Sequence, residues 1–348
     1  MRKGSVFVSP VAAGAIGLFT VLANPAAAGP GYTLVGSYAL PAGTSVFDLL
    51  PDGRAIALVG GELRAQAAPN STSFSTIGAF NPSLLNSFGP SFLRVSPGGT
   101  RIAIGDGNFG GTANVLLLDS AALNPSAPST AAIIPSANFD GRWLDESTLF
   151  VSGATFGDSL VNRIDAASLT SSTVIAGIGG GSGGVAFRGG SLITGAGFDF
   201  DPGVGVETGD LRAFDLAALS GSGAALDFAS AGAPLGRVLS AASLGFDDLG
   251  NLLVGGGDFS GENGFAAVID GLRVSEAFSG GPLVSSADGQ QLAPAGPQYY
   301  GITSSAATGE LLVRAFGTDT IYRYAVPAPA GAVMLISSLV WGSRRRRA

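Results

Sequence analysis

The sequence predicts an all-β fold for the central part of the chain. Short apolar segments of four to six residues alternate with Gly, Pro, Asp, Asn and Ser, which is typical of short strands joined by tight turns. Gly occurs 55 times, and no long amphipathic helix stands out. The third observation is an internal repeat of one layout: a strand, a tight turn, a very apolar second strand and a third strand.

Six units share this layout. Their predicted first strands are Val46–Leu50, Phe92–Val95, Arg142–Leu144, Gly184–Phe187, Ser243–Phe246 and Tyr299–Thr303. Their second strands are Ala55–Val59, Arg101–Ile104, Thr148–Val151, Ser191–Thr194, Asn251–Val254 and Glu310–Val313. Third strands follow in five units, at Asn114–Leu118, Leu160–Ile164, Leu211–Phe214, Ala266–Ile269 and Thr320–Tyr324. Turns such as Pro51-Asp52-Gly53 suit the connections, because Pro presets φ and Gly allows positive φ.

The second strands are apolar on both faces, which predicts that each is covered on two sides. They recur at spacings of about 43 to 60 residues, close to the length of a four-stranded propeller blade. We therefore expect a six-bladed β-propeller. A fourth, outer strand is predicted at Phe74–Phe80, Thr130–Pro135, Ser172–Ile178 and Ala225–Ala229.

The sixth unit has no room for a fourth strand, so we expect Tyr32–Leu40 to supply it and close the ring. A seven-bladed ring is the main alternative, because residues 195–245 are long enough to hold a degenerate blade. A β-sandwich or a β-solenoid is a further alternative. The body resembles β-propeller repeat proteins in this layout, and Ser96-Pro97-Gly98-Gly99 resembles a turn of exported propellers.

The N-terminus has the composition of a secretory signal helix. Arg2 and Lys3 precede an apolar core that ends near Ala23, and Ala26-Ala27-Ala28 fits the small-residue cleavage pattern. We expect a signal peptide over residues 1–28, cleaved after Ala28. The alternative, an N-terminal membrane span, fits less well because prolines interrupt and end the segment.

The C-terminus predicts a second addressing segment, over residues 326–348. Pro327-Ala328-Pro329 is followed by the 13-residue apolar run 330–342 and by Arg344, Arg345, Arg346 and Arg347. A helix of this length covers roughly 20 Å, which is short for a bilayer core of about 30 Å. The arginines are expected to stay on the cytoplasmic side. A plain single-span anchor is the alternative to transient engagement by a processing enzyme.

This tail resembles the PEP-CTERM family of sorting signals. The resemblance rests on Pro327, Pro329, the apolar run and Arg344–Arg347, with Ala328 where the family has Glu. It implies recognition by a membrane transpeptidase of the exosortase kind, export by a bacterium, and delivery to the cell surface, outer envelope or extracellular matrix. The domain between the two tags covers residues 29–325.

Composition excludes several kinds of chemistry. The chain has no His and no Cys, so Ser-His-Asp and Cys-His catalysis and zinc sites of His and Cys are excluded. Without the six basic residues of the two tags, the body carries 12 basic and 25 acidic residues, about −13. An acidic body repels nucleic acid, so no nucleic-acid partner is expected.

The loops after the second strands repeat one Phe each. These are Phe109, Phe156, Phe198, Phe259 and Phe316. One hypothesis is an aromatic, acidic face that binds polysaccharide or peptide. The other is that each Phe packs between neighbouring blades, as repeated residues in repeat proteins commonly do.

Acidic residues near the same loops are the candidates for a Ca²⁺ site. The weak candidates are Asp199, Asp201, Asp258 and Glu262, with Asp106, Asp158 and Asp247 nearby. No stretch has the spacing of a calcium-binding loop. We therefore predict an exported, non-catalytic binding or structural protein without a required cofactor. The alternative is a Ca²⁺-dependent hydrolase or lactonase that uses carboxylates.

Overall fold

The structure is a computed structural model. It describes residues 30–327, except for residues 87, 108–112, 137, 154–157, 198–206, 221–222, 258–263 and 294–297.

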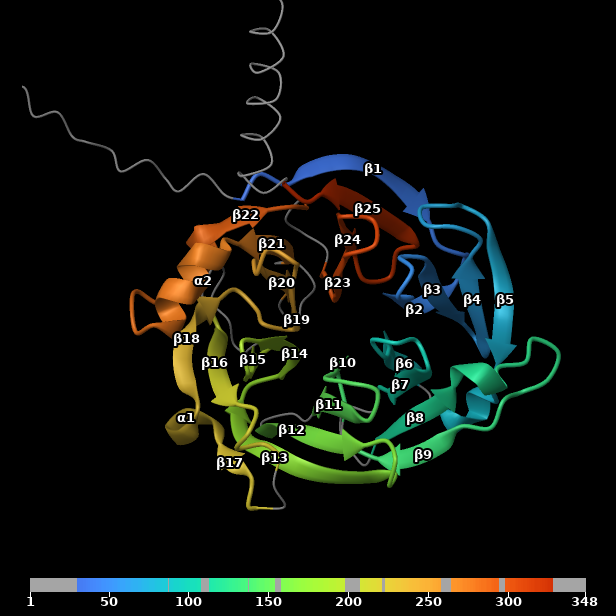
Figure 1. Ribbon diagram of the computed structural model, residues 1–348, viewed down its shortest axis with the longest axis horizontal. Coiled ribbons are helices and arrows are strands. Elements are labelled where there is room, and N and C mark those ends of the chain that lie inside the picture. The colour runs from blue at the N-terminus through green and yellow to red at the C-terminus, as the bar shows by residue number, and fades with distance from the viewer. Residues whose placement is uncertain are drawn as a thin grey trace, which may run out of the picture.

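Figure 1 shows the described strands as six sheets, or blades, arranged around a central axis. The innermost strands are β2 (Thr44–Leu49), β6 (Pro90–Val95), β10 (Gly141–Trp143), β14 (Ser182–Arg188), β19 (Ser243–Phe246) and β23 (Gly301–Ser305). The second strands are β3 (Ala55–Val59), β7 (Arg101–Asp106), β11 (Thr148–Ser152), β15 (Ser191–Ala196), β20 (Leu252–Gly256) and β24 (Glu310–Arg314). We number the blades one to six in this order.

The two outer layers complete each blade. The third strands are β4 (Glu62–Gln66), β8 (Asn114–Asp119), β12 (Asp158–Asp165), β16 (Gly209–Asp215), β21 (Phe265–Ile269) and β25 (Thr320–Ala325). The outer strands are β5 (Phe74–Ala79), β9 (Ala132–Pro135), β13 (Thr170–Gly179), β18 (Ala233–Val238), β22 (Gly289–Gln291) and β1 (Thr33–Ala39). The predicted six-bladed, all-β ring is confirmed, with shifts of a few residues at the strand ends.

The second strands are buried on both faces, as predicted. In β3, Ile56 and Leu58 pack in one cluster with Ile104 of blade two. The alternate residue Ala57 packs in another cluster with Leu312 of blade six. Because successive side chains of a strand point to opposite faces, one strand contributes to two inter-blade cores.

The N-terminal strand closes the ring, as predicted. β1 pairs antiparallel with β25, so that Tyr38 lies opposite Ile321, and the Tyr38 side chain is buried. The strand is also attached to blade five, because the side chain of Gln290 accepts from the Tyr32 N–H (2.9 Å) and donates to the Tyr32 carbonyl oxygen (2.7 Å). Blade six thus takes its outer strand from the beginning of the chain.

The predicted outer strand Ala225–Ala229 is wrong. These residues form the two-residue β17 (Leu226–Asp227), which pairs in parallel with β13 of blade three, and the start of α1 (Phe228–Ala231). The Asp227 side chain accepts the Ser230 N–H (2.9 Å), which caps the helix and ends the strand. The outer strand of blade four is β18 instead, and the described part of residues 195–245 holds no seventh blade.

The sequence pattern also missed α2 (Gly271–Phe278), which covers blade five on the outside (Figure 1). The Asp270 side chain caps it by accepting the Leu272 N–H (2.7 Å), and Val274 and Ala277 are its buried side chains. Single 3₁₀ turns occur at η1 (Pro82–Leu84), η2 (Ser120–Ala122) and η3 (Ser286–Asp288).

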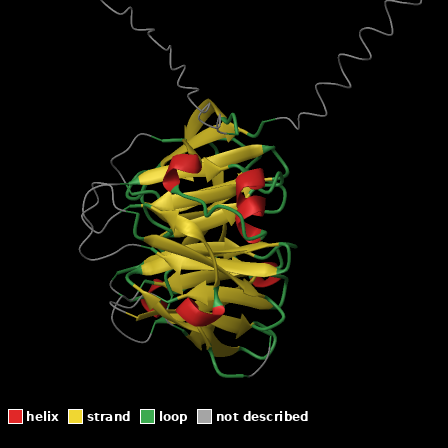
Figure 2. Ribbon diagram, turned by 90° about the vertical axis from the view of Figure 1, so that its left-hand side faces the viewer, coloured by secondary structure: helices red, strands yellow, loops and turns green. Residues whose placement is uncertain are grey.

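The strands run from one flat face of the disc to the other, as the edge-on view of Figure 2 shows. We call the face that carries the loops from second to third strands the loop face, and the opposite one, with the turns from first to second strands, the turn face. Thr33 and Ala325, which are paired across β1 and β25, lie at the turn face. The Val326 N–H donates to the Gly309 carbonyl oxygen of a turn on that face (3.1 Å). Both ends of the ring therefore meet at the turn face.

Candidate functional site

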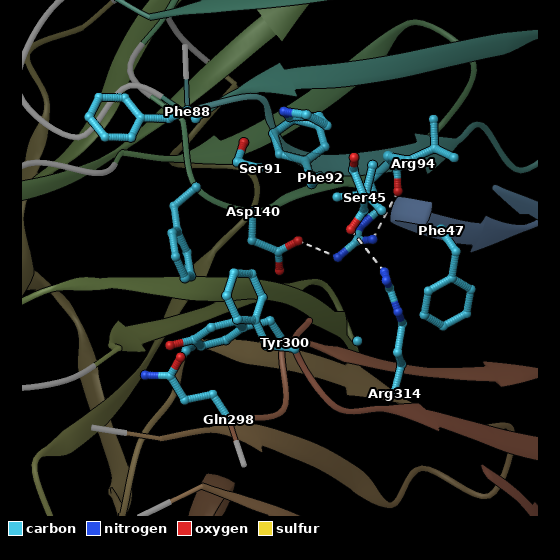
Figure 3. Close-up of a pocket in the computed structure, with 18 of the residues that line it drawn as sticks. Ser45, Phe47, Phe88, Ser91, Phe92, Arg94, Asp140, Gln298, Tyr300 and Arg314 are labelled. Atoms are coloured by element: carbon cyan, nitrogen blue, oxygen red, sulfur yellow. Dashed lines mark hydrogen bonds and ion pairs between the residues drawn. The ribbon is translucent and has the colours of Figure 1, made fainter. Parts of the chain in front are cut away.

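A cavity of about 390 Å³ opens at the loop face, where the innermost strands begin. It is lined by residues at or near the starts of β2, β6, β10 and β23 and at the end of β24. Its aromatic side chains are Phe47, Phe88, Phe92, Phe139, Tyr300 and Phe316 (Figure 3). The volume is in the range of pockets for small molecules.

Three of these aromatic residues form a continuous wall. The Phe139 and Tyr300 rings meet edge to face with centroids 5.7 Å apart, and Tyr300 meets Phe316 in the same way at 5.6 Å. Such edge-to-face pairs are favoured by the quadrupoles of the rings. Phe139 precedes β10, Tyr300 precedes β23, and Phe316 follows β24. The wall therefore joins blade three to blade six across the mouth of the central channel.

The rim of the cavity is open and apolar. Phe88 is 70% exposed and Phe316 is 66% exposed. Phe92 is buried between two glycines, because a Cβ at Gly105 would lie 2.4 Å from its ring and a Cβ at Gly141 would lie 3.0 Å from it. The cavity thus combines one buried, tightly packed ring, Phe92, with two exposed rings at its rim.

A buried ion pair forms the floor. Arg94 of β6 donates to Asp140, directly before β10, and also to the carbonyl oxygens of Gly141 (2.7 Å) and Leu93 (2.9 Å). Figure 3 shows this pair at the centre of the cavity lining. Because the guanidinium is held by three acceptors from two blades, the floor is rigid.

Two further charges lie beside the pair, and with it they form what we call the floor cluster: Asp48, Arg94, Asp140 and Arg142. Asp48 accepts the Val95 N–H (2.7 Å), and Arg142 donates to the Leu244 carbonyl oxygen (2.9 Å) on blade five. Burial raises the pKa of Asp48, and Arg94 acts against this rise. Burial likewise lowers the pKa of Arg142. The cluster therefore brings two basic and two acidic side chains together.

Arg314 ties blade six to blade one beside the cavity. It donates to the carbonyl oxygens of Ser45 (2.9 Å) and Thr318 (2.6 Å), and it lies 3.8 Å from Asp319. Burial lowers the pKa of its guanidinium. These contacts fix the wall against the innermost strand of blade one.

Most of the predicted site residues lie outside the described part of the chain. This holds for Asp199, Asp201, Asp258, Glu262, Phe109, Phe156, Phe198 and Phe259. It also holds for Ala26, Ala28, Pro329, Arg344, Arg345, Arg346 and Arg347, whereas Pro327 is described. Among the described residues, no three acidic groups are close enough to hold a metal ion.

Four other predicted residues lie in the described part. Asp158 is the first residue of β12 and lies opposite Gly179 of β13. Phe316 lies at the cavity rim and is exposed, so its interpretation as an inter-blade core residue is wrong. Asp106 is buried and accepts the Asn86 N–H (2.9 Å). Asp247 was expected near the same loops but lies in a turn at the turn face, where its carboxylate bonds to the Tyr32 hydroxyl and to the Asn251 amide (2.9 Å). Asp247 therefore serves ring closure.

The floor cluster and most of the wall were not predicted from the sequence. The available indication was charge in otherwise apolar inner strands, as at Arg94 in β6 and Arg142 in β10.

Within the described residues, no helix is long and apolar enough to cross a bilayer.

No family model matches the chain, and no curated relative matches it. Among solved structures, it is similar to a chain in the crystal structure of a nidogen/laminin complex. The TM-score is 0.44 at 10% sequence identity, over 66% of this chain and 75% of that one.

Proposed function

We propose that this protein is an exported, non-catalytic propeller that binds polysaccharide or peptide at the cell surface, outer envelope or extracellular matrix, through the cavity of the loop face. The observation that carries the proposal is the exposed aromatic rim, Phe88 and Phe316, over a buried, charge-balanced floor. Exposed aromatic side chains gathered around a concave site are typical of recognition sites. Support for a non-catalytic role comes from the absence of His and Cys in the chain.

The positions of the chain ends support display at a surface. Both ends of the ring meet at the turn face, opposite the cavity. A tail that begins at Val326 and engages a membrane or an exosortase-type transpeptidase would hold the turn face toward the attachment point. The cavity would then face outward, toward polymers of the surroundings.

Loss of the rim should abolish binding without affecting the fold. We expect the double variant Phe88→Ala and Phe316→Ala to lose at least about tenfold in affinity for the extracellular polysaccharide of the producing cells. The melting temperature should be unchanged, because both side chains are largely exposed. The measurement is co-sedimentation of the full chain with isolated polysaccharide, together with a thermal melt.

Leu272→Ala is the matched control, because Leu272 is 76% exposed on α2, away from the cavity. Equal binding by the double variant, the control and the parent protein would contradict a role for the cavity.

The two terminal tags should be absent from the exported protein. We expect an intact mass that lacks residues 1–28 and the arginines Arg344–Arg347, because a processing enzyme removes each tag. Replacing the four arginines by Ser should leave unprocessed protein in the membrane fraction. Native material that keeps its arginines in the cytosol would contradict export.

A further inference from the structure

We infer that the cavity takes a neutral sugar residue, with a sugar hydroxyl donating to Oδ2 of Asp140 and the C–H face of the ring against the aromatic wall. This inference rests on the proposed function and names the ligand class of the same cavity.

The first observation is an acceptor without a donor. Asp140 is 4% exposed, and its Oδ1 accepts from Arg94. Its Oδ2 is buried and has no hydrogen-bond partner among the described residues. A buried carboxylate oxygen without a hydrogen-bond partner is destabilising, because its hydration is lost and not replaced, so a bound donor would recover this free energy.

The unpaired oxygen can reach the cavity. Figure 3 shows Asp140 between Arg94 and Tyr300, with one carboxylate oxygen directed away from the guanidinium. The torsion that turns a carboxylate is soft, so the inference requires only a small turn of the Asp140 carboxylate to bring Oδ2 toward a ligand. Gly184 lies beside Oδ2 and leaves room for it because glycine has no Cβ. A Cβ at this position would lie 3.1 Å from Oδ2.

The second observation is the charge balance. The floor cluster has two basic and two acidic side chains, and Arg314 at the wall has Asp319 at 3.8 Å. A charged ligand would therefore bring a charge with no partner into a partly dehydrated site, which is costly. A neutral donor satisfies Oδ2 without this cost, which favours a hydroxyl over an ammonium group.

The third observation is the shape of the wall. Phe139, Tyr300 and Phe316 form an apolar wall beside Asp140, and aromatic rings suit the weakly positive C–H groups of a sugar ring. Gln298 also lines the cavity, and its amide is a group that can both donate and accept. An apolar face and a few polar groups match the two kinds of surface that a pyranose presents.

The test is a titration of the full chain with neutral trisaccharides of gluco, galacto and manno configuration, and with butylammonium and acetate ions. Trp143 reports on the floor, because its indole N–H donates to the Arg94 carbonyl oxygen (3.0 Å). The chain has two Trp, and the other, Trp341, lies in the C-terminal tag. We expect at least one trisaccharide to change the Trp143 fluorescence in a saturable way, and neither ion to do so.

Asp140→Asn should weaken this binding by at least about tenfold, because an amide of the same size loses the charged acceptor. Glu310→Gln is the matched control, since Glu310 is also a largely buried carboxylate paired with an arginine, Arg323, but lies at the turn face. Control binding should equal that of the parent. If Asp140→Asn does not fold in a thermal melt, Phe139→Leu replaces it and should likewise weaken trisaccharide binding.

The outcomes separate the two proposals. Saturable binding of butylammonium or acetate, with none of any trisaccharide, would overturn the sugar inference and leave the cavity as a binding site. Trisaccharide binding that is unchanged in both Asp140→Asn and Phe139→Leu would overturn the inference as well. If none of the five probes binds, the sugar inference fails. If polysaccharide binding also survives loss of Phe88 and Phe316, the proposed function fails with it.

Discussion

Deletion of residues 30–39 should cause the protein to aggregate. The deletion removes the outer strand of blade six and leaves the row of N–H and C=O groups on β25 unpaired. Such an open edge pairs readily with other chains. Size-exclusion chromatography with light scattering should show large assemblies in place of the parent peak.

A point substitution can measure how much ring closure contributes to stability while β1 still covers the edge of β25. Tyr38→Ala should lower the free energy of unfolding by about 3–5 kcal/mol, because it removes a large buried aromatic side chain. Leu34→Ala on the same strand is the control and should stay within about 0.5 kcal/mol, since Leu34 is 58% exposed. Equal denaturant midpoints for the two variants would show that ring closure does not stabilise the protein.

Arg94→Met should have the second large effect. It removes the ion-pair partner of Asp140 and the cation with the largest effect on Asp48, and leaves only Arg142 beside them. Breaking a buried pair from one side costs about 3–5 kcal/mol. The control is Arg54→Met, which breaks a more exposed pair with Asp52 (2.7 Å) and should cost less than about 1 kcal/mol. Urea unfolding of both variants makes the comparison.

The loss caused by Arg94→Met should depend on pH. Burial already raises the pKa of Asp48, and removing Arg94 takes away the largest opposing cause. An acid with a raised pKa in the folded state binds more protons folded than unfolded, so stability falls as pH rises through that range. The destabilisation of the variant should therefore be smallest near the ordinary Asp pKa of about 3.9 and should grow as the pH rises toward neutral. A loss that is constant with pH would contradict this account of Asp48.

The ring could be predicted because its determinants are local. Strands such as β3 and β20 carry apolar residues at every position, and only an element covered on both faces needs that pattern. The predicted outer strand at Ala225–Ala229 was wrong for a local reason. There the side chain of Asp227 forms a helix cap, and one local hydrogen bond overrode a weak strand pattern.

The cavity could not be predicted because its parts are distant in sequence. Arg94 and Asp140 belong to neighbouring blades, and Phe139 reaches Tyr300 only because blades three and six face each other across the channel mouth. No local pattern encodes these contacts. They follow from ring geometry, which brings the starts of all innermost strands together.

The direction of β25 has a mechanical consequence. This strand leads from the loop beside Phe316 to Ala325 at the turn face, and it is hydrogen-bonded to β24 on one side and to β1 on the other. A force applied between a molecule bound in the cavity and an attachment point after Val326 would act along the axis of β25. All hydrogen bonds on both sides of β25 then share the load in shear, whereas a pull between Thr33 and Ala325 would separate β1 from β25 one bond at a time. The same seam would thus resist a pull along β25 and open under a pull between Thr33 and Ala325.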